Sequence, residues 1–106
     1  MQAIGLLMAN ILDAGGEKLA TMDEDNKVRD LQGKIIGHVL NNGDVLNVGG
    51  HKIGEYDDKG DIYEGGHKIG MVRGDGSVFD YNNHCVGKIT GGHISSGGAA
   101  LLLLVR

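Results

Sequence analysis

A single short motif recurs along this chain of 106 residues with a period of 15 to 17 residues. It reads Lys-Ile-Gly, any residue, an apolar residue, a polar turn containing Gly, and then apolar residues followed by an acid. The glycine of the motif, called the marker position below, falls in successive copies at Gly5, Ala20, Gly37, Gly54, Gly70 and Gly87. A fixed period predicts similar small units packed side by side, because one unit alone cannot bury its apolar face.

Each unit has the length of two short strands. Val, Ile and Tyr cluster around the marker position, and the recurring Gly disfavours a helix. Segments such as Asn41-Asn42-Gly43-Asp44 and Asp57-Asp58-Lys59-Gly60 are typical of hairpin turns, in which Gly or Asn adopts a positive φ. The sequence therefore predicts one all-β domain, a meander of about a dozen short strands arranged radially as a shallow closed barrel. Its units would span residues 1–13, 17–30, 34–47, 51–64, 67–80 and 84–94.

Three columns of apolar residues recur in register with the repeat. The first column is Leu19, Ile36, Ile53, Ile69 and Val86; the second is Met22, Val39, Tyr56, Val72 and Ile89; the third is Val28, Val45, Ile62, Val78 and Ile94. The first two columns are three residues apart, which would place them on opposite faces of a flat strand. A β-bulge at the marker position would bring both to one face and bend the strand. We therefore expect all three columns to lie in a central core.

The C-terminal segment Ala99–Val105 departs from the repeat and is continuously apolar. Such a run predicts a strand or a plug that is buried on both sides. We expect residues 99–105 to close the ring by pairing with the N-terminal strand around Ile4 to Met8, which would remove the open sheet edges. The alternative is a tail that touches a membrane. At seven residues, the run is far shorter than the roughly 20 that span a bilayer.

The Lys-Ile-Gly repeats, together with the ending Gly97-Gly98-Ala99-Ala100-Leu101, resemble the β-flower proteins in their five-fold version. Members of that family are small bacterial domains in which β-hairpins radiate like petals around a short symmetric barrel. The resemblance covers essentially the whole chain and implies a fold, since most members have no assigned function. The chain departs from the family pattern at Ala20 and in its shortened first unit. The broader shape is similar to tubby-like and scramblase-like barrels, an analogy of fold that suggests lipid contact.

Two sets of equivalent polar residues are candidates for a binding site. His51, His67 and His84 occupy the same slot in three successive units, so a rotationally symmetric ring would place them at one height, as a metal site requires. Against this, the same slot holds Glu17 and Lys34 in the first two copies. The second set ends each unit and could bind a cation such as calcium or cap the following turn; it is Asp13, Asp30, Asn47, Glu64 and Asp80.

No catalytic arrangement is found. Equivalent units give their carboxylates equivalent environments, which argues against a division into acid and base. The net charge is −4, and the ten Lys and Arg residues are spread along the chain, which argues against a nucleic-acid partner. We expect no cofactor and no transmembrane segment. The single cysteine, Cys85, is expected as a small core residue and, with the absence of a signal peptide, favours the cytoplasm.

The sequence thus favours a non-enzymatic binding or interaction module that uses the central opening or one face of the ring. Its partner would be a protein or a small apolar, lipid-like ligand. The residues expected to contact it are Tyr56, Val39, Val72, Leu101 and Leu103. The alternatives are a metal-binding protein that uses His51, His67 and His84, and a purely structural protein that assembles into a homo-oligomer.

Overall fold

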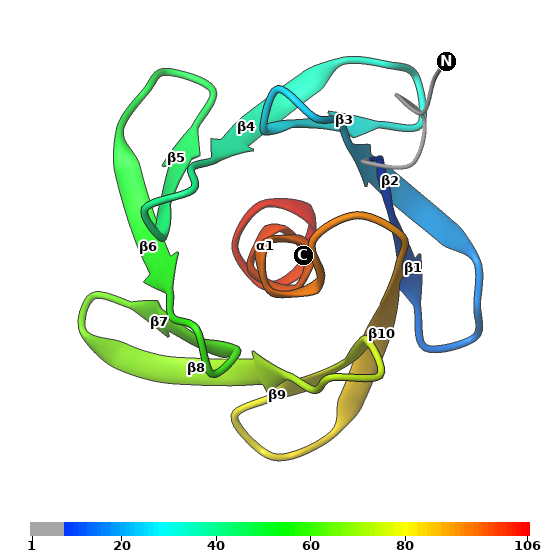
Figure 1. The fold of residues 1–106 in the computed structure, drawn as a ribbon, viewed down its shortest axis with the longest axis vertical. Coiled ribbons are helices and arrows are strands. Elements are labelled where there is room, and N and C mark those ends of the chain that lie inside the picture. The colour runs from blue at the N-terminus through cyan, green and yellow to red at the C-terminus, as the bar shows by residue number, and fades with distance from the viewer. Residues whose placement is uncertain (1–7) are drawn as a thin grey trace.

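Ten short antiparallel strands form a closed barrel in the computed structural model, which describes residues 8–106 (Figure 1). The strands are β1 (Ala9–Asp13), β2 (Lys18–Met22), β3 (Lys27–Asp30), β4 (Ile35–Val39), β5 (Asp44–Asn47), β6 (Lys52–Tyr56), β7 (Asp61–Glu64), β8 (His67–Val72), β9 (Ser77–Asp80) and β10 (Cys85–Thr90). Each strand pairs with its neighbour in the sequence, and β1 pairs with β10. The expected all-β meander, closed into a barrel of hairpins, is confirmed.

The ring closes between its first and last strands. Asn10 pairs with Thr90 and Ile11 with Ile89, so β1 takes the place of a second strand in the last repeat. This corrects the third apolar column: Ile94 begins a helix, and the fully buried Ile11 fills its place opposite Ala20. The ten strands therefore make five petals, formed by β1–β2, β3–β4, β5–β6, β7–β8 and β9–β10.

Every petal contains a β-bulge beside its marker position. In the petal of β5 and β6, Val45 pairs with Gly54 and Leu46 with Lys52, which leaves Ile53 without a partner. The same shift occurs in the other four petals and leaves the rest of the first column unpaired, namely Leu19, Ile36, Ile69 and Val86. The bulge predicted at the marker position is confirmed. It lets the second and third columns face the interior together, while the first column is half-buried.

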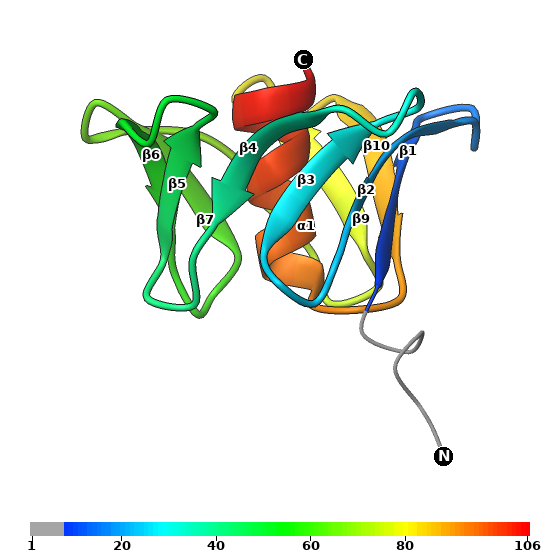
Figure 2. The same cartoon turned by 90° about the horizontal axis from the view of Figure 1, so that it is seen from above.

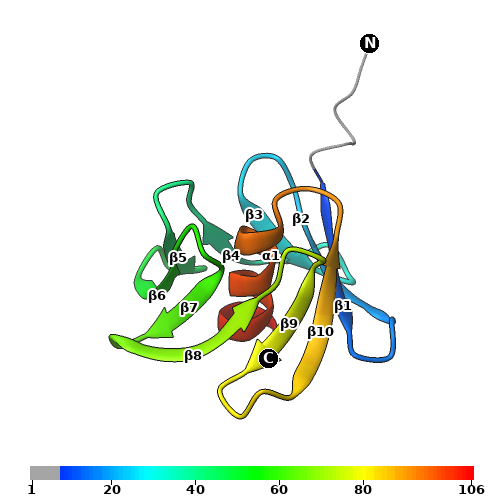
Figure 3. The same cartoon turned by 60° about the horizontal axis from the view of Figure 1, so that its bottom comes forward.

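The expectation that residues 99–105 form a closing strand is wrong. The segment continues helix α1 (Ile94–Ala100) into a π-helical turn, η2 (Leu101–Val105), and strands surround this helix on all sides (Figures 1 and 3). A lone strand inside an apolar barrel would leave its backbone groups without partners, whereas a helix satisfies them within the segment. Residues 4–7 of the proposed partner strand lie outside the described residues. No helix within residues 8–106 is long and apolar enough to cross a bilayer.

Side-chain sizes on the helix and on the barrel are complementary. Small residues of α1 face the large second column: a Cβ on Gly97 would lie 2.6 Å from Ile89, and one on Gly98 would lie 2.7 Å from Val72. One turn further on, large residues of η2 face the marker glycines. Leu101, Leu102, Leu103 and Leu104 lie against Gly87, Gly70, Gly54 and Gly37, respectively. Barrel and helix therefore pack in two layers: in one, small helix residues meet large barrel residues, and in the other, large helix residues meet small barrel residues.

The π-helical turn matches the number of petals. Successive leucines meet successive petals, so each residue must advance by about 72° rather than the 100° of an α-helix with 3.6 residues per turn. A wider turn with i to i+5 hydrogen bonds reduces this angle. The N–H of Arg106 donates such a bond to the Leu101 carbonyl at 3.1 Å.

The barrel has two distinct ends (Figure 2). At the first, here called the tip end, lie the C-terminus and the loops inside each petal, called tip loops: residues 14–17, 31–34, 48–51, 65–66 and 81–84. At the opposite end, called the turn end, α1 begins and the inner turns join one petal to the next: residues 23–26, 40–43, 57–60 and 73–76.

Candidate functional site

Backbone N–H groups donate hydrogen bonds to an acid or amide side-chain oxygen in four of the five tip loops. In the second loop, Oδ1 of Asp30 accepts the backbone N–H groups of Gln32 and Lys34, each at 2.9 Å. Asp13, Asn47 and Asp80 cap their loops in the same way. Glu64, whose loop is two residues shorter, makes no such bond among the described residues. Capping of the following turn, rather than binding of a cation, therefore accounts for these four residues of the second candidate set.

The residue that follows each cap stands at the apex of its loop, and three of these apices are large and apolar. Leu31 is 62% exposed, Val48 is 65% exposed and Tyr81 is 78% exposed. The other two apices are small, Ala14 and Gly65. Large apolar side chains with most of their surface in water, repeated at equivalent positions of one end of a barrel, mark a candidate contact surface. We call Leu31, Val48 and Tyr81 the apolar tips.

The turn end provides an internal comparison. Two of its four inner turns use the same cap: Oδ1 of Asp23 accepts the N–H groups of Asp25 and Lys27, and Oδ1 of Asp57 accepts those of Lys59 and Asp61. The apices of the four inner turns are nevertheless polar or small: Glu24, Asn41, Asp58 and Gly74. Turn geometry alone therefore does not require an apolar apex. The difference between the ends is a property of the surface rather than of the fold.

His51 and His84, two of the three residues predicted to bind a metal ion, are the last residues of their tip loops, and the third, His67, is the first residue of β8. All three are exposed and belong to different petals. Within residues 8–106, no group of three His, Cys, Asp or Glu side chains could hold a metal ion. His84 instead lies 3.7 Å from Asp80, the cap of its own loop. The pKa of Asp80 is lowered mainly by the hydrogen bond from the His84 N–H. The geometry gives the metal hypothesis no support.

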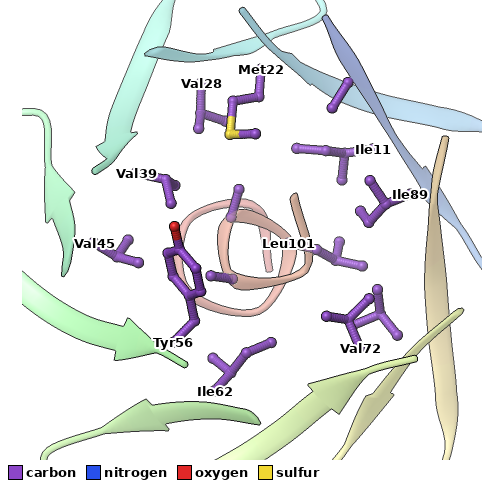
Figure 4. Close-up of a cluster of buried hydrophobic side chains, with 14 of the residues drawn as sticks. Ile11, Met22, Val28, Val39, Val45, Tyr56, Ile62, Val72, Ile89 and Leu101 are labelled. Atoms are coloured by element: carbon purple, nitrogen blue, oxygen red, sulfur yellow. The ribbon is translucent and has the colours of Figure 1, made fainter. Parts of the chain in front are cut away.

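The residues expected to line a central ligand site belong to the core (Figure 4). Val39 and Leu101 are fully buried, and Val72 and Tyr56 are nearly so. Leu103 is half-buried and lies against Gly54. The helix runs along the axis at the place where the central opening was expected, and these side chains pack around it. Their arrangement is that of packing residues, so the candidate contact surface moves to the tip end.

A chain of polar side chains at the start of α1 was missed by sequence reasoning. The Tyr56 hydroxyl donates to the Leu40 carbonyl at 3.0 Å, and the buried Ser96 hydroxyl donates to the Tyr56 oxygen at 3.0 Å. Because the Ser96 hydroxyl already donates its one proton to Tyr56, its oxygen accepts the hydrogen bond from the Nδ1–H group of His93. The available signals were the spacing of three residues between His93 and Ser96 and the single hydroxyl in the second column. This series of hydrogen bonds fixes the position of the first turn of α1 in the barrel.

A surface cavity of about 410 Å³ lies between β6 and the short tip loop of residues 65–66 and is partly lined by Lys52 and Tyr63. Nζ of Lys52 lies 2.8 Å from Glu55 and 3.1 Å from Asp44, and these hydrogen bonds raise the pKa of Lys52. Burial and the nearby carboxylates raise the pKa of Tyr63. The only charged groups at this cavity are paired with one another, which leaves no free charge for a ligand among its lining residues.

Cys85 corrects another expectation. It is exposed rather than a core residue, because its place at the start of β10 lies on the open side of the bulge, where Lys52 and Lys68 stand in other petals.

Comparison with protein-family models gives no match. Comparisons with curated proteins and with solved structures also find no match.

Proposed function

We propose that this protein is a non-enzymatic interaction module that makes its contacts through the tip end of the barrel. The observation that carries the proposal is the set of three exposed apolar tips, Leu31, Val48 and Tyr81. An apolar side chain left in water forgoes roughly 1.5–3 kcal/mol that burial would provide. Three such residues at equivalent positions are therefore best explained by a partner that covers them.

The contrast between the two ends supports this proposal. Folding selects turn residues for backbone conformation, and the polar apices Glu24, Asn41 and Asp58 show which residues such turns take when no contact is required. The half-buried first column and the end of η2 add apolar surface between the tip loops. The partner would thus meet a ring of loops around an apolar centre, rather than enter the barrel as a small ligand.

We further propose that the chain belongs to the β-flower family. Five hairpin petals around a short barrel, one marker residue per petal and the Gly-Gly-Ala-Ala-Leu segment agree with that resemblance. Bacterial origin and a cytoplasmic location remain part of the proposal. Self-assembly is the second candidate function, and the same observation favours it, because apolar tips could equally be covered by another copy of the chain.

Native mass spectrometry of the protein as purified tests the proposal. The informative variant is Leu31→Asn/Val48→Asn/Tyr81→Asn, which gives the tip loops the apex residue that the inner turn at Asn41 already has. The control is Glu24→Asn/Asp58→Asn at the turn end. We expect the native protein and the control to retain added mass, either a bound partner or a second copy, and the tip variant to appear as a bare single chain. Added mass retained by the tip variant would count against a contact surface at the tips, and bare native protein would count against self-assembly and against a protein partner that co-purifies.

A further inference from the structure

We propose that the tip end docks on the surface of an anionic lipid bilayer, with Leu31, Val48 and Tyr81 entering the boundary between headgroups and acyl chains. This inference rests on the proposed function and names its partner. It follows from three features of the tip end: the isolation of the apolar tips, the charges that accompany them, and the contrast in charge with the turn end.

The apolar tips are separated from one another rather than merged into one patch. They stand on three different petals, and exposed polar or glycine residues follow each of them, such as Gln32 after Leu31 and Asn82 after Tyr81. The core of a protein interface is contiguous and largely apolar. A bilayer surface needs only that each apolar group reaches the acyl chains while its polar neighbours remain among the headgroups. Tyrosine is moreover enriched at this boundary. Separate tips therefore favour a lipid surface over a second copy.

A potentially basic side chain accompanies each apolar tip. Three residues after each tip, at the last position of its loop, Leu31 has Lys34, Val48 has His51 and Tyr81 has His84. All three basic side chains are exposed. The loop whose apex is Ala14 has Glu17 at that position. All three apolar apices thus have a Lys or His neighbour, whereas the two small apices have Glu17 and, in the shorter loop of Gly65, His67. The Lys ammonium and the imidazole N–H groups can meet the phosphates of anionic lipids at headgroup depth.

The distribution of charge along the barrel axis orients this contact. The turn-end segments 23–27, 41–44, 57–61 and 73–77 contain eight Asp and Glu against three Lys and Arg. The tip-end segments 13–18, 30–34, 47–52, 64–68 and 80–85, together with Arg106, contain five of each. An anionic surface repels the turn end and leaves the tip end free to approach. The charge distribution therefore directs the apolar tips towards the lipid.

The tip end also has an apolar centre that suits this geometry. The helix ends there (Figure 2), and the side chains of Leu102, Leu103 and Leu104 near its end are only half-buried. Once the tips are inserted, this centre lies close to the headgroups and loses contact with water. The tips fix the position and the centre adds apolar area, so binding strength should follow the number of apolar tips.

The chain contains no tryptophan, so one can be introduced as a local probe. We would compare Tyr81→Trp at the tip end with Asp58→Trp at the turn end, and add vesicles of phosphatidylcholine with or without phosphatidylserine. Entry into the boundary moves tryptophan emission to shorter wavelength. We expect this shift for position 81 with phosphatidylserine vesicles and none for position 58. The absence of a shift at position 81, or equal shifts at both positions, would overturn the proposal.

Vesicle co-sedimentation provides the second measurement. We expect Leu31→Asn/Val48→Asn/Tyr81→Asn to lower the affinity for phosphatidylserine vesicles at least tenfold, and the control Glu24→Asn/Asp58→Asn to leave it unchanged. Lys34→Gln/His51→Gln/His84→Gln should remove the preference for phosphatidylserine over phosphatidylcholine. The urea midpoint of each variant confirms that it is folded. Equal binding by the tip variant and the native protein would overturn the proposal.

The outcome also separates this inference from the proposed function. If native protein fails to bind vesicles but forms a dimer that the tip substitutions disrupt, the lipid surface is the wrong partner and the tip end remains an interaction surface. If vesicles bind equally well through the turn end, as judged by the probe at position 58, the assignment of the face is wrong as well. If native protein neither binds vesicles nor retains a second copy or other partner, both proposals fall.

Discussion

At the marker position of the third petal, Gly54, the fold leaves room for little more than a hydrogen atom. A Cβ on Gly54 would lie 2.6 Å from both a Leu103 methyl group and the Tyr63 carbonyl oxygen. Neither neighbour can move freely, since Leu103 is held in the ring of leucines and the carbonyl belongs to the sheet. We expect Gly54→Ala to lower the free energy of unfolding by about 1–3 kcal/mol, as overpacking in a core does. Urea denaturation measures the difference.

The matched control for this substitution is Gly74→Ala. Gly74 stands at the apex of an inner turn, has no heavy atom within 4 Å of a built Cβ, and does not have a positive φ. Alanine there should leave stability unchanged or raise it by up to about 1 kcal/mol through lower entropy of the unfolded chain. Equal destabilisation by the two substitutions would show that loss of glycine itself, rather than the contact with Leu103 and Tyr63, is responsible.

Asp80 links the stability of one tip loop to pH. Its pKa is lowered from the ordinary value of 3.8, first by the hydrogen bond from the His84 N–H. A lowered pKa in the folded state means that the ionised cap stabilises the fold above the unfolded pKa. This stabilisation is lost as the pH falls through the folded value. Asp80→Asn places at this cap the amide found at the equivalent Asn47, which keeps the hydrogen bond but does not titrate.

We therefore expect the stability of native protein relative to Asp80→Asn to be highest near neutral pH and to decline below pH 3.8. Urea unfolding of both proteins across this range measures the difference, and the titration of the other acids cancels because both proteins share them. A difference that stays constant down to the lowest pH would show that the carboxylate at this cap has the same pKa in the folded and unfolded chain.

At the scale of elements, the central helix contributes most where it fills the barrel completely. Leu101 is fully buried against Gly87, so Leu101→Ala should leave a cavity and destabilise the protein by about 2–5 kcal/mol. Leu31→Ala removes the same atoms from an exposed tip and should change stability by no more than about 0.5 kcal/mol. Thermal and urea unfolding compare the two. Similar losses from both would contradict the arrangement of η2 inside the ring.

The repeat predicted the strands, the bulges and the closed ring, because strand periodicity and turn chemistry are encoded locally in every unit. The helix could not be predicted in this way. A short, continuously apolar run looks the same in a buried strand and a buried helix, and the glycines at Gly97 and Gly98 argue against a helix by propensity. Two tertiary conditions decide the outcome: the axis of the barrel offers no backbone partner, and only small residues fit beside Ile89 and Val72.

The candidate site shows the same division between local and tertiary information. Symmetry predicted that His51, His67 and His84 share one height, but they belong to separate petals, and no group of three possible metal ligands forms among the described residues. Tyr56 was expected to contact a ligand because it is apolar and equivalent to core residues; the helix covers it instead. The apolar tips are visible in the sequence only when the two sets of turns are compared, which requires knowing which turns share an end.

At the scale of the whole molecule, the fold depends on joining the two ends of the repeat array. The first and last strands pair along four residue positions, from Asn10 with Thr90 to Asp13 with Gly87. A repeat array without this seam would have two open sheet edges, each with unpaired backbone groups. The seam connects segments about 80 residues apart in sequence, so its formation carries the largest loop-closure entropy of any strand pair in the barrel.

A disulfide across the seam should therefore stabilise the protein more than one within a petal. In a Cys85→Ser background, which removes the exposed native thiol, we would introduce Asn10→Cys and Thr90→Cys. Directly opposed residues of antiparallel strands have Cα atoms about 4.5–5.5 Å apart, within the range that disulfides span. Closing a loop of this length should raise the free energy of unfolding by roughly 4 kcal/mol relative to the reduced form.

The matched control pairs Asn10→Cys with Lys88→Cys, which lies opposite Leu12 and is thus two positions out of register. Mild oxidation should link the first pair readily and the second pair poorly, as counted by free thiols and by mass. If both pairs linked equally well, or if the disulfide at 10 and 90 gave no stabilisation, the seam would not hold the first and last strands in this register.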